Sequence, residues 1–270
     1  MRIVFPDFVS LATRRPPRPP MPRSAHILHR VARAALLVAA AFVPAMVSLP
    51  ASAALSVVGT RFIYSGGARA QTIAARNLGS TPILVQIWLD EGNANADPGG
   101  LRVPFVVAPP LARLDPQQAL AIQVRAMGGE LATDRESRFW INLLEVPPAG
   151  QADNMLRIAY RLRMKLLYRP RGIDGDPRDA PDRLRWTVAD AQAHSVLVSV
   201  NPTPYYVTLT RVVVQGRPIV LAGGAVDVEP FGRTEIPLDA RSGPPVDDIL
   251  FDAVDDGGQS HEHRGRLDAH

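Results

Sequence analysis

Short segments with the character of β-strands, separated by turns rich in Gly, Pro and Asn, fill the chain from Leu55 onward. In these segments apolar side chains recur at every second position, or β-branched and aromatic residues predominate, and both patterns are typical of strands. No window predicts an amphipathic helix. Frequent turns between short strands favour an all-β fold of immunoglobulin-like sandwiches, because each strand then buries one face against a second sheet. The expected strands are Leu55–Tyr64, Ala70–Asn77, Ile83–Leu89, Phe105–Ala108, Leu111–Leu114, Ala119–Val124, Phe139–Val146, Leu156–Tyr168, Leu184–Val188, Ser195–Asn201, Tyr205–Val214, Ile219–Leu221, Ala225–Val228, Arg233–Ile236 and Ile249–Val254.

A polar stretch rich in Gly, Pro and Asp, residues 171–182, divides these strands into two groups. Such a composition is typical of a connection between domains. We therefore expect an N-terminal immunoglobulin-like domain over residues 54–170 and a C-terminal one over residues 183–270. The last residues, 257–270, are polar, and they predict either a final edge strand or a frayed tail.

The first 53 residues predict an export signal rather than folded structure. An apolar run from Ala34 to Val47 follows basic residues, and Ala51-Ser52-Ala53 has the small-residue pattern of a cleavage site, with cleavage after Ala53. The run is shorter than a transmembrane helix needs, so we expect no membrane insertion. A start at Met21 in place of Met1 would give the signal an ordinary length.

Removal of this segment changes the charge of the chain. It carries seven of the 30 basic residues and one of the 26 acidic ones, which leaves 23 basic against 25 acidic residues and a net charge of −2. The isoelectric point near 9.9 is therefore high largely because of the arginines of the signal. It does not indicate binding to nucleic acid. The chain has no cysteine, which excludes disulfides, thiolate metal sites and thiol catalysis.

Residue types that carry catalysis or bind metals do not form a recognisable pattern. There is no Gly-x-Ser-x-Gly motif, P-loop or dinucleotide fingerprint. The acidic doublets at 247–248 and 255–256 are adjacent residues, which face opposite sides of a strand and so do not form an acid and base pair. The histidines of His261-Glu262-His263 would share one face of a strand, but no third metal ligand is evident in the sequence. We expect no enzyme activity, no metal and no cofactor.

The one lysine of the chain, Lys165, lies in its longest alternating run. All 29 other basic residues are arginine. Residues 155–170 alternate apolar and basic side chains and end in proline, which predicts a long strand with one cationic and one apolar face. An ammonium is a compact, strongly hydrated charge, unlike the planar guanidinium of arginine. Lysine at this position indicates a role that needs an ammonium, the alternative being a chance lysine on a solvated strand.

Five segments of the chain match the sequence pattern of a known protein family, and they occur in the same order as in that family. They are Thr60–Tyr64, Gln86–Asp90, Asp134–Pro148, Met164–Pro170 and Asn201–Val207. Together they resemble the periplasmic chaperones of the chaperone–usher pilus pathway. The resemblance implies two immunoglobulin-like β-sandwich domains in an L-shaped arrangement. It also implies ATP-independent binding of pilus subunits in the periplasm and their delivery to an outer-membrane usher. The short connection at residues 149–154 resembles the short-loop branch of the family.

The resemblance also implies roles for individual residues. The long strand would complete the open sandwich of a subunit by donor-strand complementation, a form of strand addition. Arg61 and Lys165 would anchor the C-terminal carboxylate of the subunit through charge-assisted hydrogen bonds. An inter-domain salt bridge would join Glu145, Arg169 and Asp256. The side chains expected to insert into the subunit are Leu156, Ile158, Tyr160 and Leu162.

Other classes of function make different demands on the sequence. A secreted two-domain adhesin or carbohydrate-binding module would need aromatic residues in loops, whereas here they lie in expected strands. An exported hydrolase would need a nucleophile and a base. Only the chaperone hypothesis requires both an apolar edge strand and the pair of Arg61 and Lys165. An exposed apolar strand would also let the free protein cap itself by dimerising.

Overall fold

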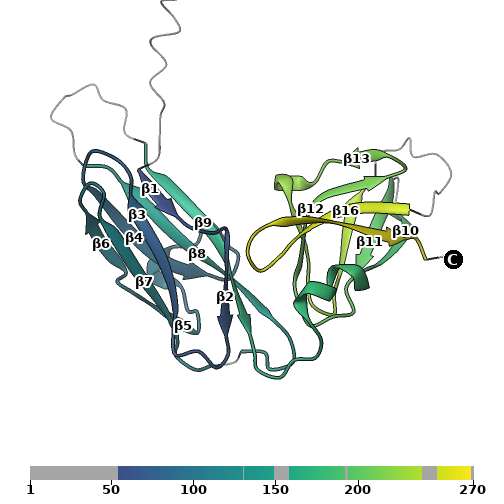
Figure 1. The fold of residues 1–270 in the computed structure, drawn as a ribbon, viewed down its shortest axis with the longest axis horizontal. Coiled ribbons are helices and arrows are strands. Elements are labelled where there is room, and N and C mark those ends of the chain that lie inside the picture. Colours follow the sequence, from purple (N-terminus) through teal and green to yellow (C-terminus); the bar gives the residue numbers. More distant parts are fainter. Residues whose placement is uncertain (1–53, 130, 149–157, 192–193, 239–247, 269–270) are drawn as a thin grey trace, which may run out of the picture. The chain divides into compact units, whose positions relative to one another are not determined.

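Two β-sandwiches, each with its own hydrophobic core, make up the described part of the protein (Figure 1). The structure, a computed structural model, describes residues 54–129, 131–148, 158–191, 194–238 and 248–268. These residues form strands and short 3₁₀ turns, with no α-helix among them. The prediction of an all-β fold of two sandwiches is confirmed. The expected export signal, Leu156 and the short connection at residues 149–154 lie outside the described residues.

The first sandwich packs a four-stranded sheet against a five-stranded one. Alternate residues of the strands enter the core between the sheets, as in β4, where Ile83, Val85, Ile87 and Leu89 are buried. The first sheet has the order β1 (Leu55–Val57), β3 (Gln71–Asn77), β7 (Ala119–Ala126), β5 (Phe105–Ala108). The second has the order β2 (Arg61–Ser65), β9 (Tyr160–Arg169), β8 (Ser137–Val146), β4 (Ile83–Asp90), β6 (Leu111–Leu114).

The first expected strand, Leu55–Tyr64, is broken in the structure. Gly59 has a φ of +104°, a conformation that other residues rarely adopt, and it separates β1 from β2. The two pieces belong to opposite sheets: β1 pairs with β3, and β2 pairs in parallel with β9. The parallel pairing covers only Lys165–Arg169. Within the described residues, the stretch Tyr160–Met164 therefore pairs with β8 alone, and its other edge is open.

The second sandwich has a core around Trp186, Leu209 and Phe251. Its first sheet has the order β10 (Arg185–Ala191), β11 (His194–Val200), β15 (Arg233–Pro237). Its second has the order β13 (Arg217–Ile219), β12 (Val207–Val214), β16 (Asp248–Val254), β17 (Ser260–Arg266), and β14 (Val226–Val228) also pairs with β12.

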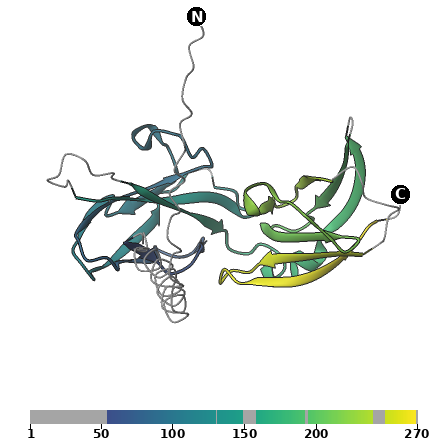
Figure 2. The same ribbon diagram turned by 90° about the horizontal axis from the view of Figure 1, so that it is seen from above.

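The polar C-terminal segment is an edge strand and not a frayed tail. Strand β17 pairs with β16 from Ser260 to Arg266, and the hairpin that they form is yellow in Figure 2. Its side chains are mostly exposed, which an edge strand tolerates. Because they are polar and exposed, apolar alternation does not predict this strand.

The polar stretch 171–182 is more ordered than a simple linker. It includes the 3₁₀ turns η3 (Pro177–Asp179) and the start of η4 (Pro181–Arg183). Ala180 between them is buried in the second core, and the hydroxyl of Tyr205 donates to the carbonyl of Gly175 at 2.8 Å. No helix in the described residues is long and apolar enough to cross a membrane.

Candidate functional site

Arg61 and Lys165 lie side by side where the open edge of β9 ends. Arg61 is the first residue of β2, and the parallel register pairs it directly with Lys165 of β9. Both cations donate to the hydroxyl of Thr208 on β12, Arg61 from Nη2 at 2.6 Å and Lys165 from Nζ at 3.0 Å. The structure therefore brings together the two residues that the sequence analysis singled out. It also adds a hydroxyl of the second sandwich, which that analysis missed.

The guanidinium of Arg61 is buried among groups of the second sandwich. Its Nη1 donates to the carbonyls of Val254 at 2.8 Å and of Asp255 at 3.2 Å. The residue is only 7% exposed. Burial lowers the pKa of Arg61, although nearby carboxylates, Asp227 foremost, act in the opposite direction. Arg61 is thus held by a set of neutral acceptors in addition to facing acidic neighbours.

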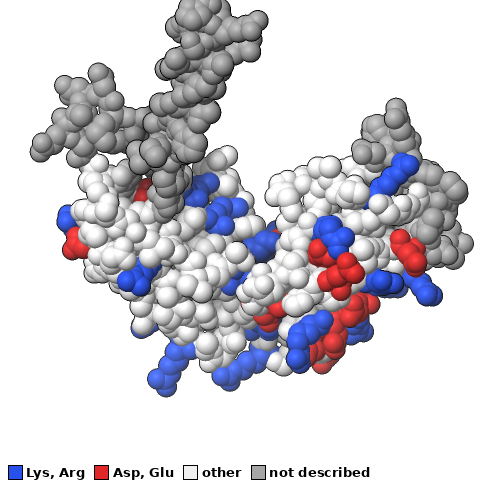
Figure 3. Space-filling view, turned by 45° about the horizontal axis from the view of Figure 1, so that its top comes forward, with Lys and Arg blue, Asp and Glu red and all other residues white. Residues whose placement is uncertain are grey.

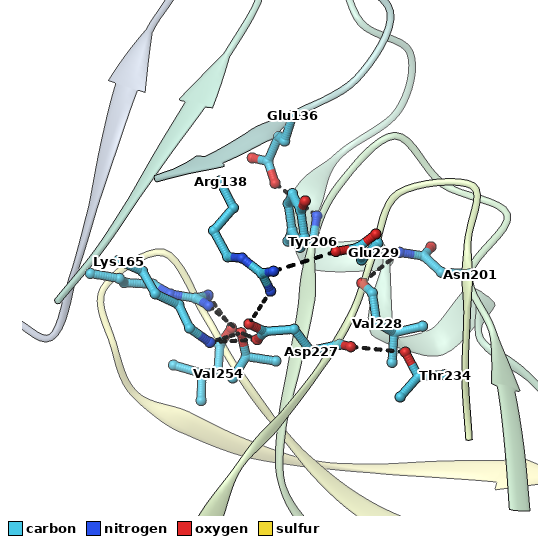
Figure 4. A network of polar contacts seen from close by, with 12 residues as sticks. Glu136, Arg138, Lys165, Asn201, Tyr206, Asp227, Val228, Glu229, Thr234 and Val254 are labelled. Carbon is cyan, nitrogen blue, oxygen red and sulfur yellow. Dashed lines mark hydrogen bonds and ion pairs between the residues drawn. The ribbon is translucent and has the colours of Figure 1, made fainter. Parts of the chain in front are cut away.

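A largely buried carboxylate, that of Asp227 of β14, completes this cluster (Figure 4). Its oxygens accept from Lys165 Nζ, from Thr208 Oγ1 at 2.6 Å and from Arg138 Nη1 at 2.7 Å. Burial alone would raise the pKa of Asp227, but Lys165, Thr208 and Arg138 together hold it below its usual range. Two cations and one hydroxyl therefore hold the carboxylate of Asp227.

The environment of Lys165 is unfavourable for its charge despite this carboxylate. Burial lowers the pKa of Lys165, and the positive charges of Arg61 and Arg138 add to that effect. Asp227 opposes the shift without abolishing it. A second anion at this place would stabilise the ammonium further, because opposite charges a few ångströms apart attract strongly where water is excluded.

The cationic face that the alternating run predicts is present on β9. Arg163 lies over the ring of Trp140 with its guanidinium carbon 4.2 Å from the ring centroid, and Lys165 Nζ lies 5.6 Å from the same centroid. Arg163 also donates to the buried Asp90 at 2.6 Å. The rings and carboxylates of neighbouring strands therefore hold the basic side chains of β9 in fixed positions.

The apolar face of β9 changes character along the strand. Ile158, just before the strand, is 50% exposed, and Tyr160 is 37% exposed. Leu162 is partly buried against the core of the first sandwich, and Met164 is fully within it. The apolar row therefore enters the protein's own core at Leu162, and the insertion of this residue into a subunit stays a prediction.

The ion pair around Arg169 contains the predicted Asp256, but its second acid is Glu136 and not the predicted Glu145. Arg169 donates to both oxygens of Asp256, at 2.7 and 2.8 Å, and its Nε donates to Glu136 at 2.7 Å. Burial raises the pKa of Glu136, although Arg169 and the backbone N–H of Tyr206 oppose the shift. Hydrogen bonds and charges of these acids raise the pKa of Arg169 in spite of its burial.

Glu145, which the resemblance placed in this ion pair, lies elsewhere. It is opposite Tyr160 at the far end of β8, where its carboxylate accepts from the backbone N–H of Leu55 at 2.8 Å. The assignment of Glu145 was wrong because the segment Asp134–Pro148 contains a glutamate near each end. Only the antiparallel register shows that Glu136 is the one beside Arg169.

The histidines of the C-terminal strand each contact one carboxylate. His261 Nε2 lies 2.8 Å from Asp255, and His263 Nδ1 lies 2.6 Å from Asp182. The described residues contain no group of three or more side chains suited to bind a metal ion.

Acidic and basic side chains lie side by side on the face of the second sandwich drawn in Figure 3.

Comparisons with known proteins agree with this architecture. Residues 54–174 match the family model of the N-terminal domain of PapD, a pili and flagellar-assembly chaperone. Residues 179–265 match the model of the C-terminal domain of the pili assembly chaperone PapD. The fold is therefore that of a two-domain β-sandwich chaperone.

Relatives with similar sequences are fimbrial chaperones. The probable fimbrial chaperone YadV of Escherichia coli is 41% identical over 160 residues, which are 57% of this chain and 65% of that protein. The chaperone protein HifB of Haemophilus influenzae is 35% identical over 235 residues, which are 84% of this chain and 93% of that protein. The chain therefore belongs to the family of PapD-type pilus-assembly chaperones, which are chaperones and not enzymes.

A solved structure from Salmonella enterica, of the SafA pilin in complex with the SafB chaperone, is similar to this chain. It has 29% sequence identity and a TM-score of 0.69, and the match covers 81% of this chain and 99% of that one. Family membership favours a chaperone over the adhesin, carbohydrate-binding and hydrolase alternatives.

Proposed function

We propose that this protein is a periplasmic chaperone that binds pilus subunits by donating the open edge of β9 to them. One observation carries the proposal: the stretch Tyr160–Met164, whose second edge pairs with no strand among the described residues, leads directly to Lys165, and Lys165 is paired with Arg61. An extended subunit segment that added to this edge would end at two cations. The similar chaperone SafB is solved in complex with the SafA pilin, which supports pilus subunits as the partners of this protein.

Strand addition accounts for affinity at the open edge. An unpaired edge offers backbone N–H and C=O groups that a further strand can satisfy. Ile158 and Tyr160 are 50% and 37% exposed beside it, and a subunit that buries the exposed part of such a side chain gains about 1 kcal/mol for each before ordering costs. Leu156 would extend the same row. The edge therefore combines backbone pairing with apolar contact.

The two cations account for register. Charge-assisted hydrogen bonds to a C-terminal carboxylate are shorter and stronger than neutral ones. A carboxylate held between Arg61 and Lys165 would fix where the subunit strand begins, and in a strand a slip of one residue turns every side chain to the wrong face. The binding free energy itself stabilises the folded subunit by mass action, so no ATP is needed.

Several further features belong to the same proposal. Cleavage after Ala53 would release the mature chain into the periplasm, where it would deliver subunits to an outer-membrane usher.

Domain boundaries near 54–170 and 183–270 are supported by the matched ranges 54–174 and 179–265. The short-loop branch is proposed from residues 149–154. In the absence of a subunit, two copies of the protein would cap each other through the open edges of β9.

The experiment is a binding assay with the C-terminal peptide of a pilus subunit from the same bacterium, as the free acid and as the amide. We expect the free acid to bind more tightly, and we expect Arg61→Ala and Lys165→Ala to abolish the difference. Arg211→Ala is the matched control, because Arg211 pairs with Asp252 and Glu262 away from β9. Equal binding of acid and amide to the unmodified protein would contradict the anchor.

A further inference from the structure

The cations of the proposed anchor are not free in the protein as it stands. Lys165 Nζ donates to Asp227 and to Thr208, so two of its three N–H groups have partners. The hydroxyl of Thr208 also accepts a hydrogen bond from Nη2 of Arg61, and it donates to Asp227 at 2.6 Å. A carboxylate of the second sandwich therefore already occupies the place next to the two cations.

We propose that Asp227 is an internal substitute for the subunit's C-terminal carboxylate: it occupies Lys165 in the free protein and gives up that ammonium when a subunit binds. The inference rests on the proposed function, because it concerns the same anchor. The two groups are chemically equivalent, each being a carboxylate that accepts from an ammonium and a hydroxyl. The subunit would then exchange one carboxylate for another.

The surroundings of Asp227 permit this exchange. Its second oxygen keeps a bond from Arg138 at 2.7 Å, so the carboxylate retains a cationic partner when Lys165 leaves it. Arg138 in turn contacts the more exposed Glu229 at 3.4 Å. Arg61 donates to two backbone carbonyls and to the hydroxyl of Thr208, and no ion pair joins it to a carboxylate among the described residues, which leaves its positive charge available for a second anion.

The exchange makes the anchor selective. A small carboxylate in solution would have to displace Asp227 without any other contact. A subunit terminus arrives together with a strand that pairs along β9, and the contacts of that strand offset the loss of the bond between Lys165 and Asp227. The internal carboxylate thus lowers occupation of the anchor by unrelated anions and leaves it open to a strand that ends in a carboxylate.

Asp227→Asn tests the inference, and Glu229→Gln is its matched control. Both variants remove one negative charge near β14, and both residues contact Arg138, but only Asp227 contacts Lys165. We expect Asp227→Asn to bind the free-acid peptide about tenfold more tightly, at the low end of couplings measured between close charge pairs. Binding of the amide peptide should stay the same in both variants, and Glu229→Gln should leave acid binding within about twofold.

The outcomes separate the two hypotheses. If the unmodified protein prefers the acid and Asp227→Asn binds it no better or more weakly, Asp227 positions Lys165 and does not compete, and the inference is wrong while the anchor stands. If the unmodified protein does not distinguish acid from amide, the anchor itself fails and this inference fails with it.

A second measurement needs no substitution. Because Lys165 is the only lysine of the chain, lysine labelled with ¹⁵N at the side chain gives a single ammonium signal in NMR. We expect this signal to shift when the free-acid peptide binds and to stay in place when the amide binds. A signal that stays in place at saturating free acid would mean that Lys165 keeps Asp227, and it would overturn the inference even if Asp227→Asn does not fold.

Discussion

The two halves of β9 differ in what covers them. From Lys165 to Arg169 the strand pairs with β2 on one side and β8 on the other, and its side chains contact both sandwiches. From Tyr160 to Met164 it pairs only with β8 among the described residues, and its apolar face becomes exposed toward Ile158. One strand is therefore a structural element at one end and the proposed binding edge at the other, and the proposed anchor lies at the boundary.

The largest contrast between the halves should appear in stability. Leu166 is completely buried in the first core, so Leu166→Ala should lower the free energy of unfolding by about 2–5 kcal/mol. Ile158→Ala, at a half-exposed position, should change it by less than about 0.5 kcal/mol. Urea denaturation of both variants measures the difference. Similar losses of unfolding free energy in the two variants would mean that both halves of β9 contribute equally to stability.

Subunit binding should show the reverse contrast. Tyr160→Ala removes a partly exposed side chain beside the open edge, and it should weaken binding of the subunit peptide by about 1 kcal/mol, which is roughly fivefold. Its unfolding midpoint should be nearly unchanged. Val220→Ala is a suitable control, because Val220 is exposed on the second sandwich. If Tyr160→Ala binds the peptide as the unmodified protein does, the open edge is not the binding site.

Glu136, just before β8, and Glu145, near the end of β8, should differ in their coupling to Arg169. A double-mutant cycle of Glu136→Gln with Arg169→Ala should give an interaction energy of about 0.5–3 kcal/mol, as expected for residues in contact. The same cycle with Glu145→Gln should give a value within about 0.5 kcal/mol of zero, because Glu145 lies at the other end of the strand. Thermal or urea unfolding of the variants provides the data. A coupling to Glu145 as large as that to Glu136 would contradict the pairing in the structure.

The smallest effect concerns the pH dependence of stability at the boundary. The pKa of Asp227 is held below its ordinary value in the folded protein, so Asp227 binds a proton less readily there than in the unfolded chain. Its contribution to stability is therefore present above the unfolded pKa, near 3.9, and it is lost as the pH falls through the folded pKa. Unfolding measured between neutral and acidic pH should show a smaller loss for Asp227→Asn. An identical pH profile would mean that Asp227 gains nothing from its cations.

Strand patterns predicted much of this architecture. Period-2 alternation locates β4, β8 and β9, and the lone lysine indicates the anchor, because both signals lie within a single segment of the chain. The break at Gly59 was missed, since the residues on either side of it continue the strand-like composition. That break moves β2 into the second sheet, and it is the reason that β9 is covered at only one end.

Features that depend on register or on the other sandwich were beyond the reach of the sequence. Glu136 and Glu145 are both glutamates of the same segment, and only the pairing of β8 with β9 shows which of them lies beside Arg169. Asp227 lies in a short strand between valines, where an acidic residue normally faces solvent. Its burial follows from the approach of Arg138 and Lys165 from the first sandwich, 89 and 62 residues away in the chain.

Hydrogen exchange along β9, with and without a pilus subunit, tests the central claim most directly. In the free protein, amides of Lys165–Arg169 should be protected on both edges, whereas those of Tyr160–Met164 that point to the open edge should exchange fast. Binding of the subunit should slow exchange in Tyr160–Met164 and leave Lys165–Arg169 nearly unchanged. Unaltered exchange in Tyr160–Met164 at saturating subunit would contradict strand donation from this edge.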